Sequence, residues 1–331
     1  MPDSMILTRG LAIPDPNFLQ PMGDAWSYGS GFSASSFSAV ATSEGCGRAL
    51  KIDVTGADGT SDYAITSAFT PYGVCGAPWS DDSSDRKPYV VYCIRAKTSG
   101  MAGNTAEILK AQLNQYRANG SFIVKTCKTD TGDGPTDETD WTLFTAVETG
   151  TEFNTQAYWH KLQLTFTDSD GGGGYVYISF VGVGILYGVE ALTYDQIDNT
   201  YSPKIVKLTS AKTRWITPQN TLNPIIRTDN MGARSETITL AFPALSTAEK
   251  QIIERAEIWN TSQPDDDVSA TASMPANRGT KQPVLVALRR AEAKSAFYAD
   301  MSIGGFAQSM DWYPDSGSRW AAQVTFTERL L

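Results

Sequence analysis

The 331-residue sequence has a single histidine, only four cysteines and no long apolar run. With His160 alone, a Ser-His-Asp or Cys-His catalytic unit has only one place to form. His160 begins a β-patterned segment, so we expect a structural or exposed histidine and no enzymatic activity. Two carboxylates could make a glycosidase pair. The acidic residues lie mainly in glycine-rich loops, however, where solvated charge is the better explanation.

The cysteines all lie in the first part of the chain, and no two of them form a C-x-x-C pair. This spacing argues against a zinc site, because structural zinc needs closely spaced ligands. Four buried thiols are the simplest interpretation. One or two disulfides remain an alternative if the protein works outside a cell. The residues concerned are Cys46, Cys75, Cys93 and Cys127.

Long apolar segments and excess positive charge are also missing. The best apolar run, Val181 to Leu186, is far shorter than the roughly 20 residues of a membrane span. The N-terminal residues lack the basic start and apolar core of a signal peptide, so we expect no secretion by that route. The formal net charge of −9 argues against a general nucleic-acid binder, which needs clustered Lys and Arg.

The charge is distributed unevenly along the chain. Up to Asn199 there are 12 basic and 23 acidic residues, net −11, whereas the remainder has 15 basic and 13 acidic residues, net +2. The change predicts a boundary at this point. The stretch from Tyr175 to Pro203 contains β-patterned segments followed by a polar break. We interpret it as the end of one domain and the joint to a second.

The chain is predicted to be mostly β, with two β-sandwich domains. Residues 1–16 form an N-terminal arm, residues 17–199 a larger sandwich and residues 200–331 a smaller one. Short β-patterned runs separated by Gly, Ser, Asp and Pro are typical of such folds. The run at 106–116 has helical propensity too, but its apolar residues form no helical stripe. In the first domain the expected strands are 33–41, 48–54, 62–69, 89–96, 106–116, 122–128, 141–148, 160–167, 175–183 and 189–197.

The second unit contains the chain's best helical pattern. Ser246 and Glu249 match a capping box, and the apolar residues that follow recur at helical spacing over residues 246–259. Residues 201–208 and 212–217 begin the unit, and residues 218–224 read as a loop. The remaining strands are expected at 234–243, 282–289, 296–303, 306–313 and 320–330.

The first domain resembles the jelly-roll domains of carbohydrate-binding modules. The residues that carry the resemblance are Asn17-Phe18, Trp26, the run Ser43-Glu-Gly-Cys-Gly-Arg-Ala-Leu-Lys-Ile52, and Tyr194-Asp-Gln-Ile197. Family members often hold a structural calcium through an early acidic residue and the Asp of the final strand. The resemblance therefore implies a calcium site at Glu44 and Asp195. No other cofactor is expected.

Flat aromatic side chains are the residues on which sugar rings stack through their apolar C–H faces. Several lie at predicted strand ends or loops of the first domain, where ligand sites are usual. The alternative for each is a partly buried core position. We expect at least Trp79, flanked by Gly76-Ala-Pro and Ser80-Asp-Asp, to be exposed. The glycan-contact candidates are Trp26, Tyr28, Trp79, Tyr116, Trp141 and Trp159.

Residues from about 200 onward resemble the β-sandwich domains of tailed-phage tail and baseplate ring proteins, such as distal tail proteins. The resemblance rests on a strand, a Leu-Ser-x-x-Glu helix, paired strands and a closing Val-Thr-Phe-Thr-Glu-Arg-Leu. It implies that subunits form a ring. Aromatic residues dominate interface energies. The candidates for core or subunit contacts are Trp215, Trp259, Trp312 and Trp320.

Together these resemblances predict a non-enzymatic structural protein of a tailed-phage virion, made in the host cytoplasm. Its second domain would assemble with itself and other virion proteins in a tail-tip or baseplate ring. Its first domain would project outward, binding a host-surface glycan or stabilising the particle. One alternative is a capsid decoration or head-fibre protein. Another is an accessory carbohydrate-binding protein or a glycan-active enzyme.

Overall fold

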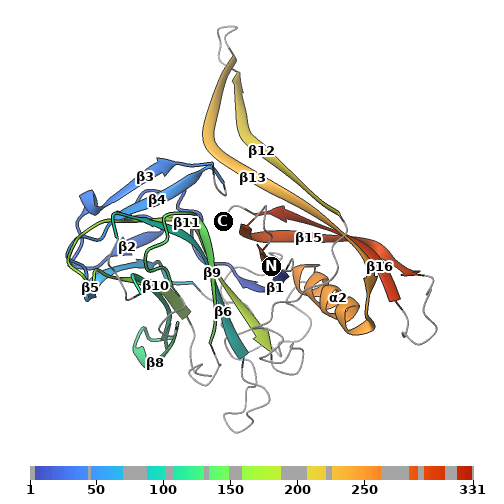
Figure 1. Ribbon diagram of the computed structural model, residues 1–331, viewed down its shortest axis with the longest axis horizontal. Coiled ribbons are helices and arrows are strands. Elements are labelled where there is room, and N and C mark those ends of the chain that lie inside the picture. The colour runs from blue at the N-terminus through green and yellow to red at the C-terminus, as the bar shows by residue number, and fades with distance from the viewer. Residues whose placement is uncertain are drawn as a thin grey trace.

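The structure is a computed structural model, and it confirms a mostly β chain with a packed α-helix (Figure 1). It describes residues 4–43, 46–69, 88–101, 107–129, 134–148, 159–187, 207–220, 226–261, 283–289, 294–309 and 319–329. No helix in these ranges has the length and apolar character of a membrane span.

Most predicted strands are found, with shifted ends. In the first part of the chain the elements are β1 (Ser4–Leu11), β2 (Trp26–Tyr28), the 3-10 helix η1 (Ala34–Ser36), β3 (Phe37–Ala41), β4 (Arg48–Asp53), β5 (Asp58–Thr66), β6 (Pro88–Ser99), β7 (Leu109–Tyr116), β8 (Phe122–Lys128), β9 (Thr142–Glu148), β10 (Trp159–Thr167) and β11 (Tyr175–Tyr187). After these come β12 (Lys207–Asn220), β13 (Ile226–Leu245), α2 (Thr247–Thr261), β14 (Val284–Arg289), β15 (Lys294–Ser309) and β16 (Arg319–Glu328). Within the run predicted as a strand at 106–116, residues 109–116 form β7.

A five-stranded antiparallel sheet forms one layer of a sandwich, in the order β2-β5-β10-β7-β8. Strand β10 shows why it forms: Leu162, Leu164 and Phe166 are buried, and the residues between them are partly exposed. This alternation places one face of the sheet against a core and the other toward solvent. The core also contains Val176 and Ile178 of β11, which belongs to the opposing sheet.

Strand β11 organises the opposing sheet. One edge pairs with β6 along Tyr175–Tyr187. The other edge is divided: Tyr175–Ile178 pair with β4, and Val183–Ile185 pair with β1. With β9 beside β6 and β3 beside β4, this half completes the sandwich.

Strand β1 continues the sheet into the second half of the chain. Its residues Ser4–Arg9 pair with β14, and Arg9–Leu11 pair with β11. The full 11-stranded sheet runs β12-β13-β16-β15-β14-β1-β11-β4-β3, with β6 also paired with β11 and β9 paired with β6. Residues 4–11, predicted to belong to an arm, are therefore an internal strand with both edges paired within the chain. The predicted boundary at Asn199 lies outside the described residues.

Helix α2 covers a second, smaller core. Ile253 of the helix is buried against strands β13 to β16, and Leu7 of β1 joins the same cluster. The predicted capping box is present: the Glu249 backbone N–H donates to Ser246 Oγ at 3.2 Å, and the Glu249 carboxylate accepts from the Ser246 N–H. These bonds satisfy N–H groups that the first helical turn leaves unpaired.

Two expectations for the second half need correction. The strands predicted at 296–303 and 306–313 are one strand, β15, with a bulge between Ile303 and Phe306. Gly305 has φ +104°, a conformation that glycine adopts without strain, so the chain bulges instead of ending the strand. Residues 218–220, expected in a loop, extend β12.

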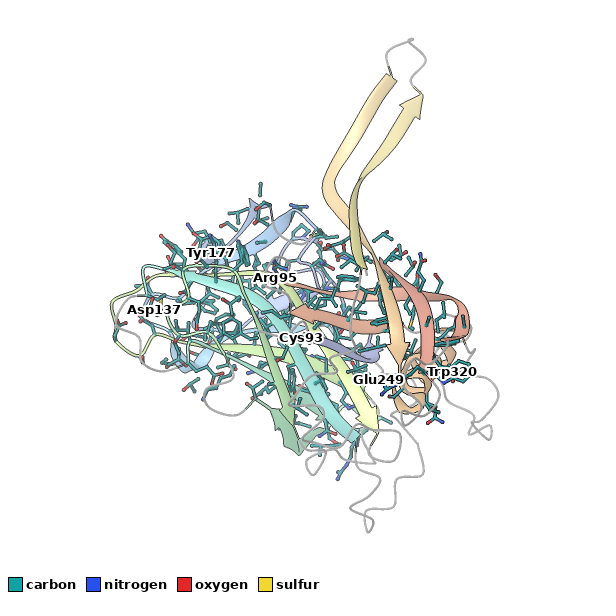
Figure 2. The ribbon with its side chains drawn as sticks, turned by 45° about the vertical axis from the view of Figure 1, so that its right-hand side comes forward. Cys93, Arg95, Asp137, Tyr177, Glu249 and Trp320 are labelled. Carbon is teal, nitrogen blue, oxygen red and sulfur yellow. The ribbon has the colours of Figure 1, made fainter. Side chains whose placement is uncertain are left out.

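The longest hairpin, β12–β13, projects from the rest of the molecule, as both views show (Figures 1 and 2). Strand β16 pairs with β13 only from Thr237 to Leu245. Beyond that point, within the described residues, β12 and β13 pair with each other as far as Asn220 and Ile226. The outer part of the hairpin is therefore a two-stranded ribbon.

Candidate functional site

Trp26, predicted to contact a glycan, is a core residue. Its side chain is 2% exposed, and its ring lies 5.0 Å from that of Phe18. The indole Nε1 donates to the backbone oxygen of Asp15 at 3.0 Å, so its polar group is satisfied inside the protein. A ligand cannot stack on this ring, which corrects the prediction.

Three aromatic residues lie side by side at one end of the five-stranded sheet. Trp159 of β10 is paired with Tyr116 of β7, and Tyr116 is paired with Phe122 of β8. The Tyr116 and Phe122 rings are 5.5 Å apart, and Phe122 is 49% exposed. All three alternate with buried neighbours, which places them on the outer face of the sheet. We call this set the aromatic end of the sheet.

The aromatic end is held in place by nearby groups. Trp159 Nε1 donates to the backbone oxygen of Arg117 at 2.6 Å, which fixes the plane of the indole. Lys161 Nζ lies 5.6 Å from the centre of the Tyr116 ring, within the range of a cation–π contact. Partial burial raises the pKa of the Tyr116 hydroxyl, so it stays protonated near neutral pH.

A row of amide side chains runs from the aromatic end along the same outer face. Gln112 Nε2 donates to Asn114 Oδ1 at 2.9 Å, and Asn114 Nδ2 donates to Gln163 Oε1 at 2.8 Å. Gln163 Nε2 then donates to Thr165 Oγ1 at 3.2 Å. Gln112 and Gln163 are partly exposed and keep further donor or acceptor capacity, whereas Asn114 is buried between them. We call these four residues the amide row.

The sequence prediction therefore located part of this surface. Tyr116 and Trp159 were predicted, whereas Phe122 and the amide row were not. For the amide row, the missed signal is the alternation of apolar and polar residues in β10 and in the first part of β7, which marks the polar residues between apolar ones as outward-facing. Tyr28 is 36% exposed, but it is paired with the inward-facing Ala64 and packs on Phe37 at 5.3 Å. It does not join the aromatic end.

Trp141 lies on the opposite sheet, next to residues that the sequence prediction did not include. Lys97 Nζ is 5.5 Å from the Trp141 ring and 5.1 Å from the Tyr177 ring. Lys51 Nζ is 3.7 Å from the Tyr175 ring and 5.9 Å from the Tyr177 ring. The alternating pattern Tyr175-Val-Tyr177 in a predicted strand could have indicated these exposed tyrosines.

Of the residues predicted for subunit contacts, Trp320 is the one whose side chain is described. It is half-buried at the second core, with Lys250 Nζ 4.6 Å from its ring (Figure 2). Trp215 lies in β12 and Trp259 in α2, but their side chains are outside the description. The remaining predicted site residues, Trp79, Glu44, Asp195 and Trp312, lie outside the described residues.

His160 occupies the sandwich core. It is fully buried, and it exchanges two backbone hydrogen bonds with Phe69 at 2.7 and 2.9 Å. Burial lowers the pKa of its imidazole to about 3, because the charged form loses its solvation. The ring is therefore neutral near neutral pH and cannot meet a substrate at the surface.

The described thiols, those of Cys46 and Cys93, are buried and form no disulfide bond. Burial raises the pKa of the Cys46 thiol to about 11. The Cys127 side chain and Cys75 fall outside the description. Within the described ranges, no three His, Cys, Asp or Glu side chains gather as a metal-binding group. The calcium expected at Glu44 and Asp195 stays a prediction.

No protein-family model and no curated protein matches the sequence. Solved structures do match part of it. The enzymatically active domain of tailspike protein 4 from bacteriophage CBA120 is 11% identical, with 54% of this chain and 22% of that chain covered and a TM-score of 0.34. The CBM22-1 xylan-binding domain of Paenibacillus barcinonensis Xyn10C is 14% identical, with 54% and 96% covered and a TM-score of 0.33. The xylan-binding module CBM15 is 12% identical, with 55% and 95% covered and a TM-score of 0.28. At these low scores, a function has to rest on the chain's own residues.

Proposed function

We propose that this chain is a non-enzymatic structural protein of a tailed-phage virion, located at the tail tip or baseplate. In this proposal its sandwich half binds a glycan on the outer face of the five-stranded sheet, and its other half assembles with further copies. The observation that carries the glycan-binding part is the aromatic end beside the amide row.

The aromatic end and the amide row offer the two kinds of contact that a sugar needs. Trp159, Tyr116 and Phe122 present flat apolar surface for the C–H faces of sugar rings. Gln112, Gln163 and Thr165 of the amide row are partly exposed and present donors and acceptors for hydroxyl groups, whereas the buried Asn114 bridges the two glutamines. Its internal hydrogen bonds hold the side chains in place before a ligand arrives, which reduces the entropy lost on binding.

The projecting ribbon of β12 and β13 supports assembly. An isolated two-stranded ribbon is at best marginally stable in water, and open strand edges invite further pairing. Among the described residues, the outer part of this ribbon pairs with no third strand. A neighbouring copy that packs against it would stabilise it, as the predicted ring requires.

Two features favour a binding protein over an enzyme. The chain's one histidine is buried and neutral, so it is not available as a surface base. The proposed glycan surface itself presents aromatic rings, amides and a hydroxyl, which bind and orient a sugar but do not supply an acid–base pair. The enzyme alternative is tested by incubating the protein with bacterial polysaccharides, where new reducing ends would contradict the proposal.

Glycan binding is tested with an array of neutral and bacterial-surface oligosaccharides. We expect retention of at least one glycan by the wild type, and a loss of about tenfold or more for Trp159→Ala, because one stacking contact is removed. Tyr28→Ala is the matched control, since Tyr28 is exposed but lies away from the aromatic end. Equal loss in both variants, or no retained glycan at all, would contradict the glycan-binding part.

Assembly is tested by light scattering on the purified chain over a range of concentrations. We expect oligomers for the wild type. In a shortened variant, residues 215–233 are replaced by Asn-Gly, which joins the paired residues Arg214 and Arg234 by a two-residue turn. This variant should be monomeric with an unchanged sandwich. A wild type that stays monomeric at high concentration would argue against the ring. The location of this chain within an assembled particle would distinguish a tail protein from a capsid decoration or head-fibre protein.

A further inference from the structure

A second surface lies on the other side of the sandwich, on the outer face of the sheet that contains β11. Tyr177 is paired with Lys97 of β6 on one side and with Lys51 of β4 on the other. Trp141 immediately precedes β9, whose Thr142 is paired with Ala96, so it lies beside Lys97. We call Trp141, Lys97, Tyr177 and Lys51 the lysine–aromatic row.

The row is continuous and accessible. It crosses four neighbouring strand positions, a span of about 14 Å at the usual strand spacing. Inward-facing Val176 and Ile178 are fully buried, whereas Tyr177 is partly exposed and Tyr175, one pleat along, is 37% exposed. Each lysine ammonium lies 3.7 to 5.9 Å from two aromatic ring centres. The charges are therefore positioned between flat apolar surfaces.

Neither ammonium is neutralised by an ion pair within the described residues. The carboxylate nearest in the strand register, Asp53, is paired with Tyr175, and its Oδ1 accepts from the Thr55 backbone N–H and hydroxyl at 3.1 and 2.7 Å. An ammonium has three donors. A cation–π contact attracts the charge without using a hydrogen-bond acceptor. Lys51 and Lys97 thus keep donors for an anionic group.

We infer that the lysine–aromatic row binds an anionic polysaccharide. Sugar rings stack on Tyr177 and Trp141, and carboxylate, sulfate or phosphate substituents accept hydrogen bonds from Lys51 and Lys97. Aromatic rings alone would suit a neutral glycan. Ammonium groups placed between the rings select a chain that carries both rings and negative charge, because the charged contact is made only with the anionic partner.

A nucleic-acid strand is the other polymer with rings and negative charge, and the structure favours it less. Nucleic-acid binding relies on several phosphate contacts along a basic groove. The row supplies two cations on a chain whose formal net charge is −9. A polysaccharide with spaced charges needs fewer cations and more stacking surface, which matches the row.

This surface is separate from the one proposed above for glycan binding. The aromatic end and the amide row lie on the outer face of the five-stranded sheet, whereas the lysine–aromatic row lies on the outer face of the opposite layer. The two surfaces can therefore be tested independently. A substitution that disrupts one surface should leave the other surface intact.

The test is isothermal titration of the wild-type chain with polygalacturonate, dextran sulfate and a phosphomannan, with neutral dextran as the reference polymer. We expect binding to at least one of the charged polymers and none to neutral dextran. Lys51→Gln and Lys97→Gln should each weaken that binding by about threefold to tenfold, the usual size of one lost charged contact. Raising the salt to about 1 M should weaken it too, because the screening length falls to roughly 3 Å.

Matched variants decide between a site and general charge attraction. Arg117→Gln removes one exposed positive charge on the other layer and should leave the affinity unchanged. Equal weakening by Arg117→Gln and the lysine variants would overturn the inference, as would no binding to any of the three charged polymers. If oligothymidylate binds equally tightly and Lys51→Gln and Lys97→Gln weaken its binding to the same extent, the ligand of the row is a nucleic acid and the inference of a polysaccharide is wrong.

Discussion

Tyr298 of β15 forms two hydrogen bonds with the backbone of Val183 in β11. Its hydroxyl accepts from the Val183 N–H at 2.7 Å and donates to the Val183 carbonyl at 3.1 Å. The contact lies where the edge of β11 passes from its pairing with β4 to its pairing with β1. Nearby, the Val181 N–H donates to the Pro16 carbonyl at 3.0 Å. Side-chain and loop groups thus replace the missing ladder bonds.

The same position joins the two halves of the molecule. Tyr298 is 1% exposed and meets Phe180 edge-on, with ring centres 5.6 Å apart. Across the joint, Asn17 Nδ2 donates to Glu328 Oε1 at 3.4 Å; within the second half, the Glu236 backbone N–H donates to Glu328 Oε2 at 2.8 Å. Buried polar contacts between segments this far apart in sequence hold the sandwich in a defined orientation on the second half.

Replacing Tyr298 by Phe tests the joint. The variant keeps the ring but leaves both polar groups of Val183 without the hydroxyl, so we expect a loss of about 1–3 kcal/mol in unfolding free energy. Urea denaturation followed by tryptophan fluorescence measures it. Tyr28→Phe, at an exposed ring, is the control and should change the free energy by less than about 0.5 kcal/mol. Equal stability of Tyr298→Phe and the wild type would show that the two bonds contribute nothing to the joint.

Gly10 of β1 is predicted to resist substitution because the chain passes close to Tyr298. A Cβ at Gly10 would lie 2.8 Å from the Pro283 carbonyl oxygen and 2.8 Å from Tyr298 Cδ1. Gly10→Ala should therefore destabilise the fold by about 1–3 kcal/mol through overpacking. Gly304→Ala is the control, since its nearest contact would be 3.6 Å. Thermal unfolding measures the stability of both variants. A Gly10→Ala variant as stable as the wild type would contradict the close packing of β1 against Tyr298.

His160 predicts a pH dependence of stability. Its pKa is about 3 in the folded protein against 6.5 for the free side chain, so the unfolded chain takes up the proton first. Stability is complete above pH 6.5 and falls as the pH decreases, by up to about 1.4 kcal/mol per pH unit. Between pH 7.5 and pH 5 we expect a loss of about 2 kcal/mol. His160→Gln, which does not titrate, should show a flatter profile over this range, and identical profiles would refute the assignment.

The helix cap can be tested by Ser246→Ala. The substitution removes the Oγ acceptor of the Glu249 N–H, and we expect a cost of about 1 kcal/mol. Thr247→Ala, at the exposed first residue of α2, is the control. Circular dichroism during urea unfolding measures the unfolding free energy of both variants. A cost in Thr247→Ala as large as that in Ser246→Ala would argue against a specific cap.

Local patterns in the sequence predicted most of the individual elements. The capping box identified α2, and alternation of apolar and polar residues identified strands such as β8 and β10. The prediction of two separate strands was wrong at Gly304-Gly305, where the chain forms a β-bulge, because a glycine pair is compatible with either a bulge or a turn. The aromatic residues were found by type, but Trp26 was a glycan-contact candidate and is a core residue, because the segment with Asp15 and Phe18 packs against it.

By itself the sequence determined the β-rich class, the amphipathic helix α2 and the presence of a single histidine, because these follow from composition and short-range periodicity. Only the tertiary structure decided which residues meet. It inserted the N-terminal strand between β11 and β14, brought Tyr298 to Val183, and aligned Trp159, Tyr116 and Phe122 on one face and the lysine–aromatic row on another. Strand register and sheet order depend on contacts between distant segments, and local periodicity does not specify those contacts.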